Sequence, residues 1–129
     1  MAKDYKEWFL QSDYDYETAQ ILFENDKFVH AIFLCHLSIE KFLKGYYLKI
    51  IKKEPPKLHS LIFFIESIGL NVPKNYKEFI LEIEDTAVAS RYPDSITKLS
   101  DKFDKQTALL INDKTKDFLQ WLQTEFSKY

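Results

Sequence analysis

A nearly continuous apolar segment constrains the fold of this chain more than any other feature. From Ala31 to Ile39 only His36 and Ser38 are polar, so a helix formed by this segment is apolar on almost every side. Such a helix lies in the centre of a bundle, where neighbouring helices cover it all round. The segment therefore predicts a buried central helix.

Three charged residues, Glu40, Lys41 and Lys44, follow at once in the same predicted helix. Burying a charge is unfavourable unless an opposite charge pairs with it. Glu40 and Lys44 are four residues apart with the carboxylate first, a spacing that lets them pair on one helix face. Two interpretations stay open: a solvated ion pair on a narrow exposed strip, or a polar site that extends into the core.

The length and composition indicate one all-α domain. The 129 residues are 46% hydrophobic, which suits one core, so residues 1–129 are expected to form a single domain. Two glycines and four prolines leave little material for hairpins. The net charge of -2 argues against a general electrostatic grip on nucleic acid. Because no apolar run reaches membrane-spanning length, we expect a cytoplasmic protein that does not bind membranes.

Apolar periodicity predicts an up-and-down antiparallel four-helix bundle with a short additional helix. The expected helices cover 4–25, 27–53, 58–68 (the short one), about 73 to the break at Pro93, and 102–127. The residues expected to bound them are Asn25 or Asp26 before the second, Gly69 after the third, and Ser100 or Asp101 before the last. Leu58, Ile62 and Leu110 are expected to face the core.

Gly45 lies inside the second predicted helix, where glycine costs roughly 1 kcal/mol relative to alanine. A close approach of another helix or another subunit would compensate for this cost. The aromatic-rich end of the helix that contains Gly45 is therefore a candidate dimer face. The single cysteine, Cys35, lies in the apolar segment and is expected to be inert packing.

The first helix carries Asp15 on its apolar stripe, where leucine would be the ordinary residue. Either this carboxylate turns to the edge of the stripe and meets water, or it pairs with a buried base. The candidate bases are Lys41, Lys44 and Arg91, the only arginine of the chain.

Metal and nucleophile chemistry have little support in the sequence. A ferritin-like centre needs Glu-x-x-His pairs, and none occurs. His36 and Glu40 form one isolated pair at a spacing of four. We expect His36 to be a hydrogen-bonded core histidine. No HExxH, P-loop or dinucleotide fingerprint is present. We therefore expect no metal, no cofactor and no catalytic residue.

A set of isolated polar residues remains as the candidate site. Its members are Asp15, Glu40, Lys41, Lys44, His59, Arg91 and Asp94. Lysine and arginine side chains that converge at a groove bind phosphate. Alternatively, the set forms structural ion pairs that fix helix register, and spacing alone favours this second interpretation.

These residues resemble the pattern of HEPN domains (higher eukaryote and prokaryote nucleotide-binding). The matching pieces are, in order, Trp8 with Asp15 and Ala19, Ala31-x-Phe33, Glu40-Lys41-x-x-Lys44, His59-x-Leu61 and Arg91-Tyr92-Pro93-Asp94. The resemblance spans about Trp8 to Trp121. It implies a helical bundle that is commonly homodimeric and that acts with a minimal nucleotidyltransferase in a two-component or toxin–antitoxin type system.

The chain departs from this family at one informative place. Many members are metal-independent ribonucleases whose site is an arginine followed, after four to six residues, by a histidine. The corresponding positions after Arg91 are Ile96, Thr97 and Lys98, and no histidine follows Arg91 anywhere. Without that imidazole the usual group that activates a ribose 2′-hydroxyl is missing, which counts against ribonuclease toxin activity.

The leading hypothesis is a non-catalytic dimeric domain that binds a nucleotide, a nucleotidyltransferase partner, or both. The expected phosphate ligands are Lys41, Lys44 and Arg91. The expected supporting polar network is Asp15, Glu40, His59, Tyr92 and Asp94, and Tyr46, Tyr47 or Tyr92 is expected to stack on a base. Two alternatives compete with it: a ribonuclease toxin with a degenerate Arg/His site that uses His59, and a purely structural dimerisation module.

Overall fold

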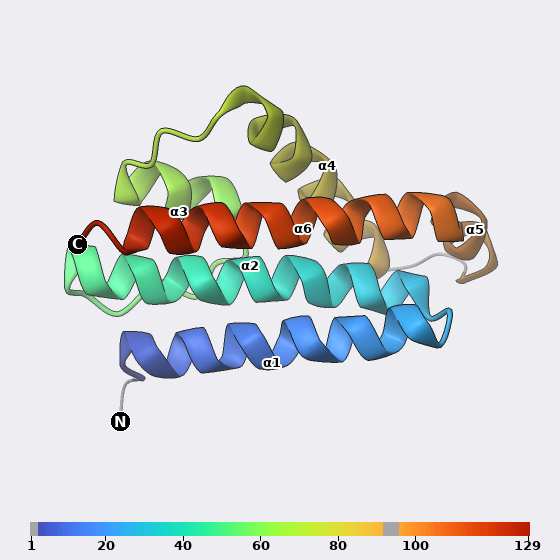
Figure 1. Ribbon diagram of the computed structural model, residues 1–129, viewed down its shortest axis with the longest axis horizontal. Coiled ribbons are helices and arrows are strands. Elements are labelled where there is room, and N and C mark those ends of the chain that lie inside the picture. The colour runs from blue at the N-terminus through green and yellow to red at the C-terminus, as the bar shows by residue number, and fades with distance from the viewer. Residues whose placement is uncertain (1–2, 92–95) are drawn as a thin grey trace.

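The computed structural model describes residues 3–91 and 96–129, without the side chains of Ser90, Arg91 and Ile96. This part of the chain forms six helices: α1 (Tyr5–Glu24), α2 (Phe28–Ile51), α3 (Leu61–Ile68), α4 (Lys74–Arg91), α5 (Ile96–Lys102) and α6 (Lys105–Phe126). The described residues contain no strand. The long helices α1, α2, α4 and α6 alternate in direction, and α3 and α5 lie in the connections between them (Figure 1). The predicted all-α, up-and-down bundle is confirmed.

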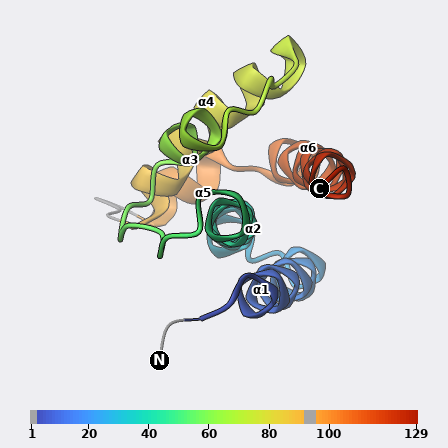
Figure 2. The same ribbon diagram turned by 90° about the vertical axis from the view of Figure 1, so that its left-hand side faces the viewer.

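Helix α2 is the centre of the bundle, as its apolar sequence predicts. It contacts all five other helices. Viewed along its axis, α2 lies between α1 on one side and α3, α4 and α6 on the others (Figure 2). Ala31, Ile32, Cys35, Ile39 and Leu43 on α2 are completely buried. A helix covered from every side has to be apolar on every side, which explains why this segment has no polar stripe.

Small residues bring α1 and α2 close together. The Ser12 hydroxyl on α1 donates to the Ser38 carbonyl oxygen at 2.7 Å, and the Ser38 hydroxyl on α2 donates to the Ser12 carbonyl oxygen at 2.8 Å. Gly45 lies two turns further along α2, and a Cβ atom placed there would lie 2.9 Å from the Tyr5 carbonyl oxygen. The close approach expected at Gly45 is therefore made by α1 of the same chain. Since α1 already covers this face of α2, the face is closed to a dimer partner.

The predicted starts of three helices, α2, α3 and α6, differ from the structure. Ser100 and Asp101 do not cap the last helix but lie inside α5, which was not predicted; Asp104 caps α6 by accepting a hydrogen bond from the Thr107 backbone N–H. Asn25 and Asp26 do not cap α2, whose N-cap, Lys27, makes no side-chain capping bond.

Asn25 instead closes α1, where its side-chain amide donates to the Ile21 carbonyl oxygen. The short helix α3 begins three residues later than predicted, and Gly69 ends it as predicted, with φ of 84°.

Three residues expected in the core are exposed: Leu58, Ile62 and Leu110. Leu58 precedes α3 and has no helix to orient it. On α6, Ala108, Ile111 and Thr115 are buried instead, so the inward stripe is rotated by one to two residues from Leu110. Within the part of the chain that is described, no helix has the length and apolarity needed to cross a membrane.

Candidate functional site

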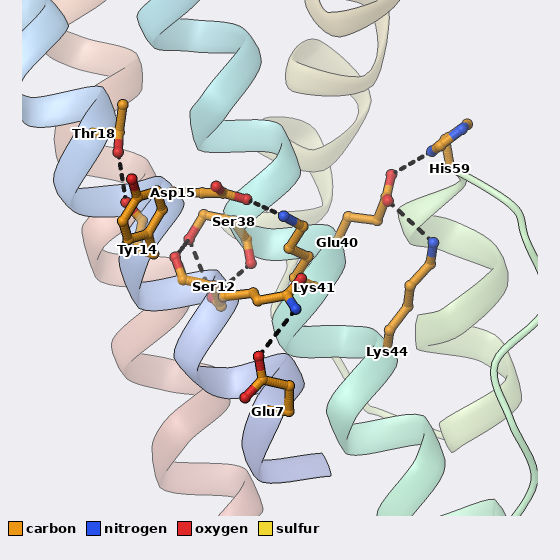
Figure 3. Close-up of polar contacts among 11 residues, drawn as sticks. Glu7, Ser12, Tyr14, Asp15, Thr18, Ser38, Glu40, Lys41, Lys44 and His59 are labelled. Carbon is orange, nitrogen blue, oxygen red and sulfur yellow. Dashed lines mark hydrogen bonds and ion pairs between the residues drawn. The ribbon is translucent and has the colours of Figure 1, made fainter. Parts of the chain in front are cut away.

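Asp15 and Lys41 form an ion pair between α1 and α2. The Lys41 Nζ atom lies 2.7 Å from Asp15 Oδ2, and both side chains are mostly buried. The two groups meet at ion-pair distance without the alignment of a regular hydrogen bond. Of the two interpretations of Asp15, pairing with a buried base is the one that holds, and Lys41 is that base (Figure 3).

Glu40 and Lys44 form a second ion pair on a different face of α2. Lys44 Nζ lies 3.2 Å from Glu40 Oε2, and the side chains are only 8% and 3% exposed. The ammonium group also lies 5.5 Å from the centroid of the Trp8 ring and 5.8 Å from that of Phe64, whose π faces attract a cation. The pair is therefore buried, and a solvated strip at this position is excluded.

Glu40 also holds His59, which comes from the segment between α2 and α3. The His59 Nδ1 atom lies 3.0 Å from Glu40 Oε1, so the two carboxylate oxygens serve two different partners (Figure 3). An ionised carboxylate only accepts hydrogen bonds, so Nδ1 carries the proton of this bond. The His59 side chain is 58% exposed. A buried network of charges thus ends at an imidazole on the surface.

A cavity of about 220 Å³ lies beside His59. Its polar lining comes from His36 on α2, His59 and Ser60 before α3, and Glu84 on α4. His36 is almost completely buried; its Nε2 atom lies 3.9 Å from Glu84 Oε1, and its Nδ1 atom has no hydrogen-bond partner in the described structure. His36 is therefore a core histidine, as expected, and among the described residues its Nδ1 atom does not make the hydrogen bond that was expected.

Glu84 connects this cavity to the start of α3. Its Oε1 atom accepts a hydrogen bond from the Leu61 backbone N–H, and Ser60 Oγ accepts one from the Phe63 N–H. These bonds satisfy N–H groups that a helix start leaves without intrahelical partners. Sequence reasoning missed Glu84, although a signal was present: it lies four residues after Ile80 and three before Ala87, and so falls on the apolar stripe of α4 just as Asp15 does on that of α1.

The structure brings together only part of the predicted site. Glu40, Lys44 and His59 form one cluster, and Asp15 and Lys41 form another. Tyr92, Asp94 and the Arg91 side chain lie outside the described residues. The Arg91 backbone belongs to α4, seven residues after Glu84, so the two positions share a helix face.

Two further residues have roles in packing. Tyr46 was a candidate for base stacking but is buried, with its ring 5.1 Å from that of Phe126 and 5.7 Å from that of Tyr129. Burial, together with the Tyr129 hydroxyl, raises the pKa of Tyr46. Burial raises the pKa of the Cys35 thiol to about 12, as expected for inert packing. No three His, Cys, Asp or Glu side chains in the described structure are arranged to hold a metal ion.

Comparison with known proteins identifies the family. A family model described as HEPN domain matches residues 5–125. The solved crystal structure of an archaeal HEPN homologue is similar to this chain, with a TM-score of 0.75 and 17% sequence identity over 96% of this chain and 98% of that one. At this identity the likeness shows a shared fold. No curated protein matches the sequence significantly. Because the family model covers nearly the whole chain, this protein belongs to the HEPN domain family.

Proposed function

We propose that this HEPN protein is a non-catalytic homodimer that binds a nucleotide and acts with a minimal nucleotidyltransferase. The observation that carries the nucleotide proposal is the network Lys44–Glu40–His59, which leads from the bundle core to an exposed imidazole beside a cavity. Burying charged groups lowers the stability of a fold, so charges that are kept in a core call for a role in packing or function. Here they orient a surface histidine, and this favours a binding role.

The charges at this site assign different roles to its basic residues. Lys41 and Lys44 each already neutralise a carboxylate, so neither offers a free positive charge to a phosphate. In the proposed complex, the phosphate is held by Arg91, whose guanidinium suits bidentate binding, and by His59 in its imidazolium form, which donates from Nε2 to the phosphate while Nδ1 donates to Glu40. Lys44 contributes by cancelling the charge of Glu40, which would otherwise repel the ligand. The proposal therefore assigns direct contact to Arg91 and His59.

Calorimetric titration with ATP and other nucleotides tests this proposal. Each lost charge-assisted hydrogen bond is worth about 1.5–3 kcal/mol, so Arg91→Ala and His59→Ala should each raise the Kd by roughly ten-fold or more. His30→Ala is the matched control, because His30 is another exposed histidine of the chain and lies at the start of α2. The absence of binding to any nucleotide by the native protein at millimolar concentration would overturn the proposal.

One observation favours a second candidate, a metal-independent ribonuclease. An imidazole whose Nδ1 is fixed by a buried carboxylate and whose Nε2 is exposed has the arrangement of a general base. In this reaction His59 would take the proton of a ribose 2′-hydroxyl, whose oxygen then attacks the neighbouring phosphate and expels the 5′-oxygen of the next nucleotide. Cleavage of RNA by the purified protein in the presence of a chelator, lost in His59→Ala and kept in His30→Ala, would replace the non-catalytic proposal.

A further inference from the structure

A hollow between α3 and α4 shares no lining residue with the cavity beside His59. It has a volume of about 380 Å³. Its buried floor is formed by Ile65, Val72 and Ile80, and its rim carries the exposed side chains of Ile62 and Leu81. We refer to this hollow as the α3–α4 groove. Its lining is mainly apolar, so a partner that covered it would remove apolar surface from water.

Apolar side chains extend this surface beyond the groove. Phe63 on α3 is also exposed, and so is Val88 on α4, which lines the cavity beside His59. Both views show α3 and α4 on the side of α2 opposite α1, with an outer surface that no other helix covers (Figures 1 and 2). Apolar surface of this kind on a soluble domain marks a site of interaction.

The charges of the groove indicate which partner it fits. Glu66 lies on the α3 wall and Lys77 on the α4 wall. Neither side chain has an ion-pair partner elsewhere in the described structure. A surface that complements this groove needs an apolar knob, a positive group facing Glu66 and a negative group facing Lys77. A second copy related by two-fold symmetry supplies all three.

We infer that the α3–α4 groove is the interface between two copies of this chain. Leu81 of each copy enters the groove of the other, and Glu66 of each copy faces Lys77 of the other. Leu81 suits this role because its side chain, 59% exposed, stands on the rim one turn after Lys77. This inference rests on the homodimer of the proposed function and assigns its face.

Sedimentation equilibrium of the full chain tests the role of Leu81. Leu81→Asp should weaken self-association roughly 30-fold or more, as for the loss of a central interface residue. Leu10→Asp is the matched control, since Leu10 is a leucine of similar exposure, 62%, on the opposite side of the molecule in α1. The control should leave the dimer unchanged. Both positions are exposed, so circular dichroism should show unchanged helix content in both variants.

A charge exchange tests the pairing itself. Glu66→Lys and Lys77→Glu should each weaken the homodimer, because each places two like charges across the interface. An equimolar mixture of these two variants should recover native affinity as a heterodimer, and the variant with both changes should recover it as a homodimer. A merely local effect on folding would not be rescued in this way.

The outcomes separate the inference from the proposal on which it rests. A native protein that stays monomeric at every accessible concentration would overturn both the homodimer and the assigned face. A native dimer that persists in Leu81→Asp, or charge variants that fail to rescue each other, would overturn only the face. Neither result bears on nucleotide binding, which calorimetry measures separately.

Discussion

Gly45 provides the sharpest test of the packing between α1 and α2. A Cβ atom at this position would lie 2.7 Å and 2.8 Å from two ring carbons of Phe9 and 2.9 Å from the Tyr5 carbonyl oxygen. The Phe9 ring has little room to turn aside, because it stacks on Phe42 with centroids 4.3 Å apart and meets Phe126 edge-on at 4.9 Å. The carbonyl belongs to the backbone of α1. Relieving the overlap therefore requires α1 and α2 to move apart.

Two opposing contributions set the effect of Gly45→Ala on the free energy of unfolding. Alanine is favoured over glycine inside a helix by roughly 1 kcal/mol. Overpacking a well-filled core costs about 1–3 kcal/mol, and a contact with backbone places this case at the upper end. We therefore expect a net loss of about 2 kcal/mol, measured by urea denaturation followed at 222 nm.

A double-mutant cycle with Phe9→Leu identifies the cause of the loss. The smaller leucine side chain removes ring carbons that the new methyl group would meet, so Gly45→Ala should cost less in the Phe9→Leu background than in the native one. If Gly45→Ala instead stabilised the protein by about 1 kcal/mol, helix propensity alone would account for it. The close approach of α1 and α2 at this position would then be refuted.

Three further predictions concern buried groups. Lys41→Met alone should destabilise the protein by about 3 kcal/mol, because it leaves the Asp15 carboxylate buried and unpaired, whereas Lys41→Met with Asp15→Leu should be close to neutral in the same urea assay. Ser12→Ala and Ser38→Ala should each cost about 1 kcal/mol in thermal or urea unfolding, since each removes one hydroxyl-to-carbonyl bond between α1 and α2. Cys35 should resist thiol reagents at neutral pH until the protein unfolds. Burial raises the pKa of the Cys35 thiol from 9.0 to about 12, so the free energy of unfolding should fall as the pH rises from 9 to 12. Below pH 9 the thiol's contribution to stability is complete. Cys35→Ala should lack this pH dependence and is the control for it.

The central position of α2 could be predicted from the sequence, because few folds can bury such an apolar helix. A segment that is apolar all round has only the centre of a bundle available to it, and α2 lies there. Gly45 in a helix interior indicated a close neighbour, and α1 is that neighbour. By contrast, the start of α6 depends on the choice among Ser100, Asp101 and Asp104, all of which are good N-caps. Local chemistry does not distinguish these three residues. In the structure Asp104 is the N-cap of α6, and its neighbour Phe103 is buried in the core.

The sequence indicated most residues of the candidate site, but not which of them pair with one another. Charges next to or on apolar stripes singled out Asp15 and Glu40 but left open whether they are solvated or buried, and the structure shows buried ion pairs at both. Spacing along one helix also gave the partner of Glu40, because Lys44 is one turn away. Nothing in the spacing selected Lys41 over Lys44 as the partner of Asp15, since that depends on how α1 rotates against α2. The position of Glu84 beside His36 likewise requires the packing of α4 on α2.

The carboxylates Glu40 and Glu84 together explain how the polar site and the fold depend on one another. Glu40 holds His59 from α2, and Glu84 holds the backbone of Leu61 from α4, so two helices fix a segment of three residues at the start of α3. A ligand that drew His59 away from Glu40 would leave the buried carboxylate with Lys44 as its one remaining partner in the described structure, at a cost of about 1.5–3 kcal/mol for the lost hydrogen bond to a charged group. A ligand that binds at Nε2 of His59 leaves the bond at Nδ1 intact and avoids this cost. For this reason we expect α3, which also forms one wall of the α3–α4 groove, to stay in place if a ligand binds at Nε2 of His59.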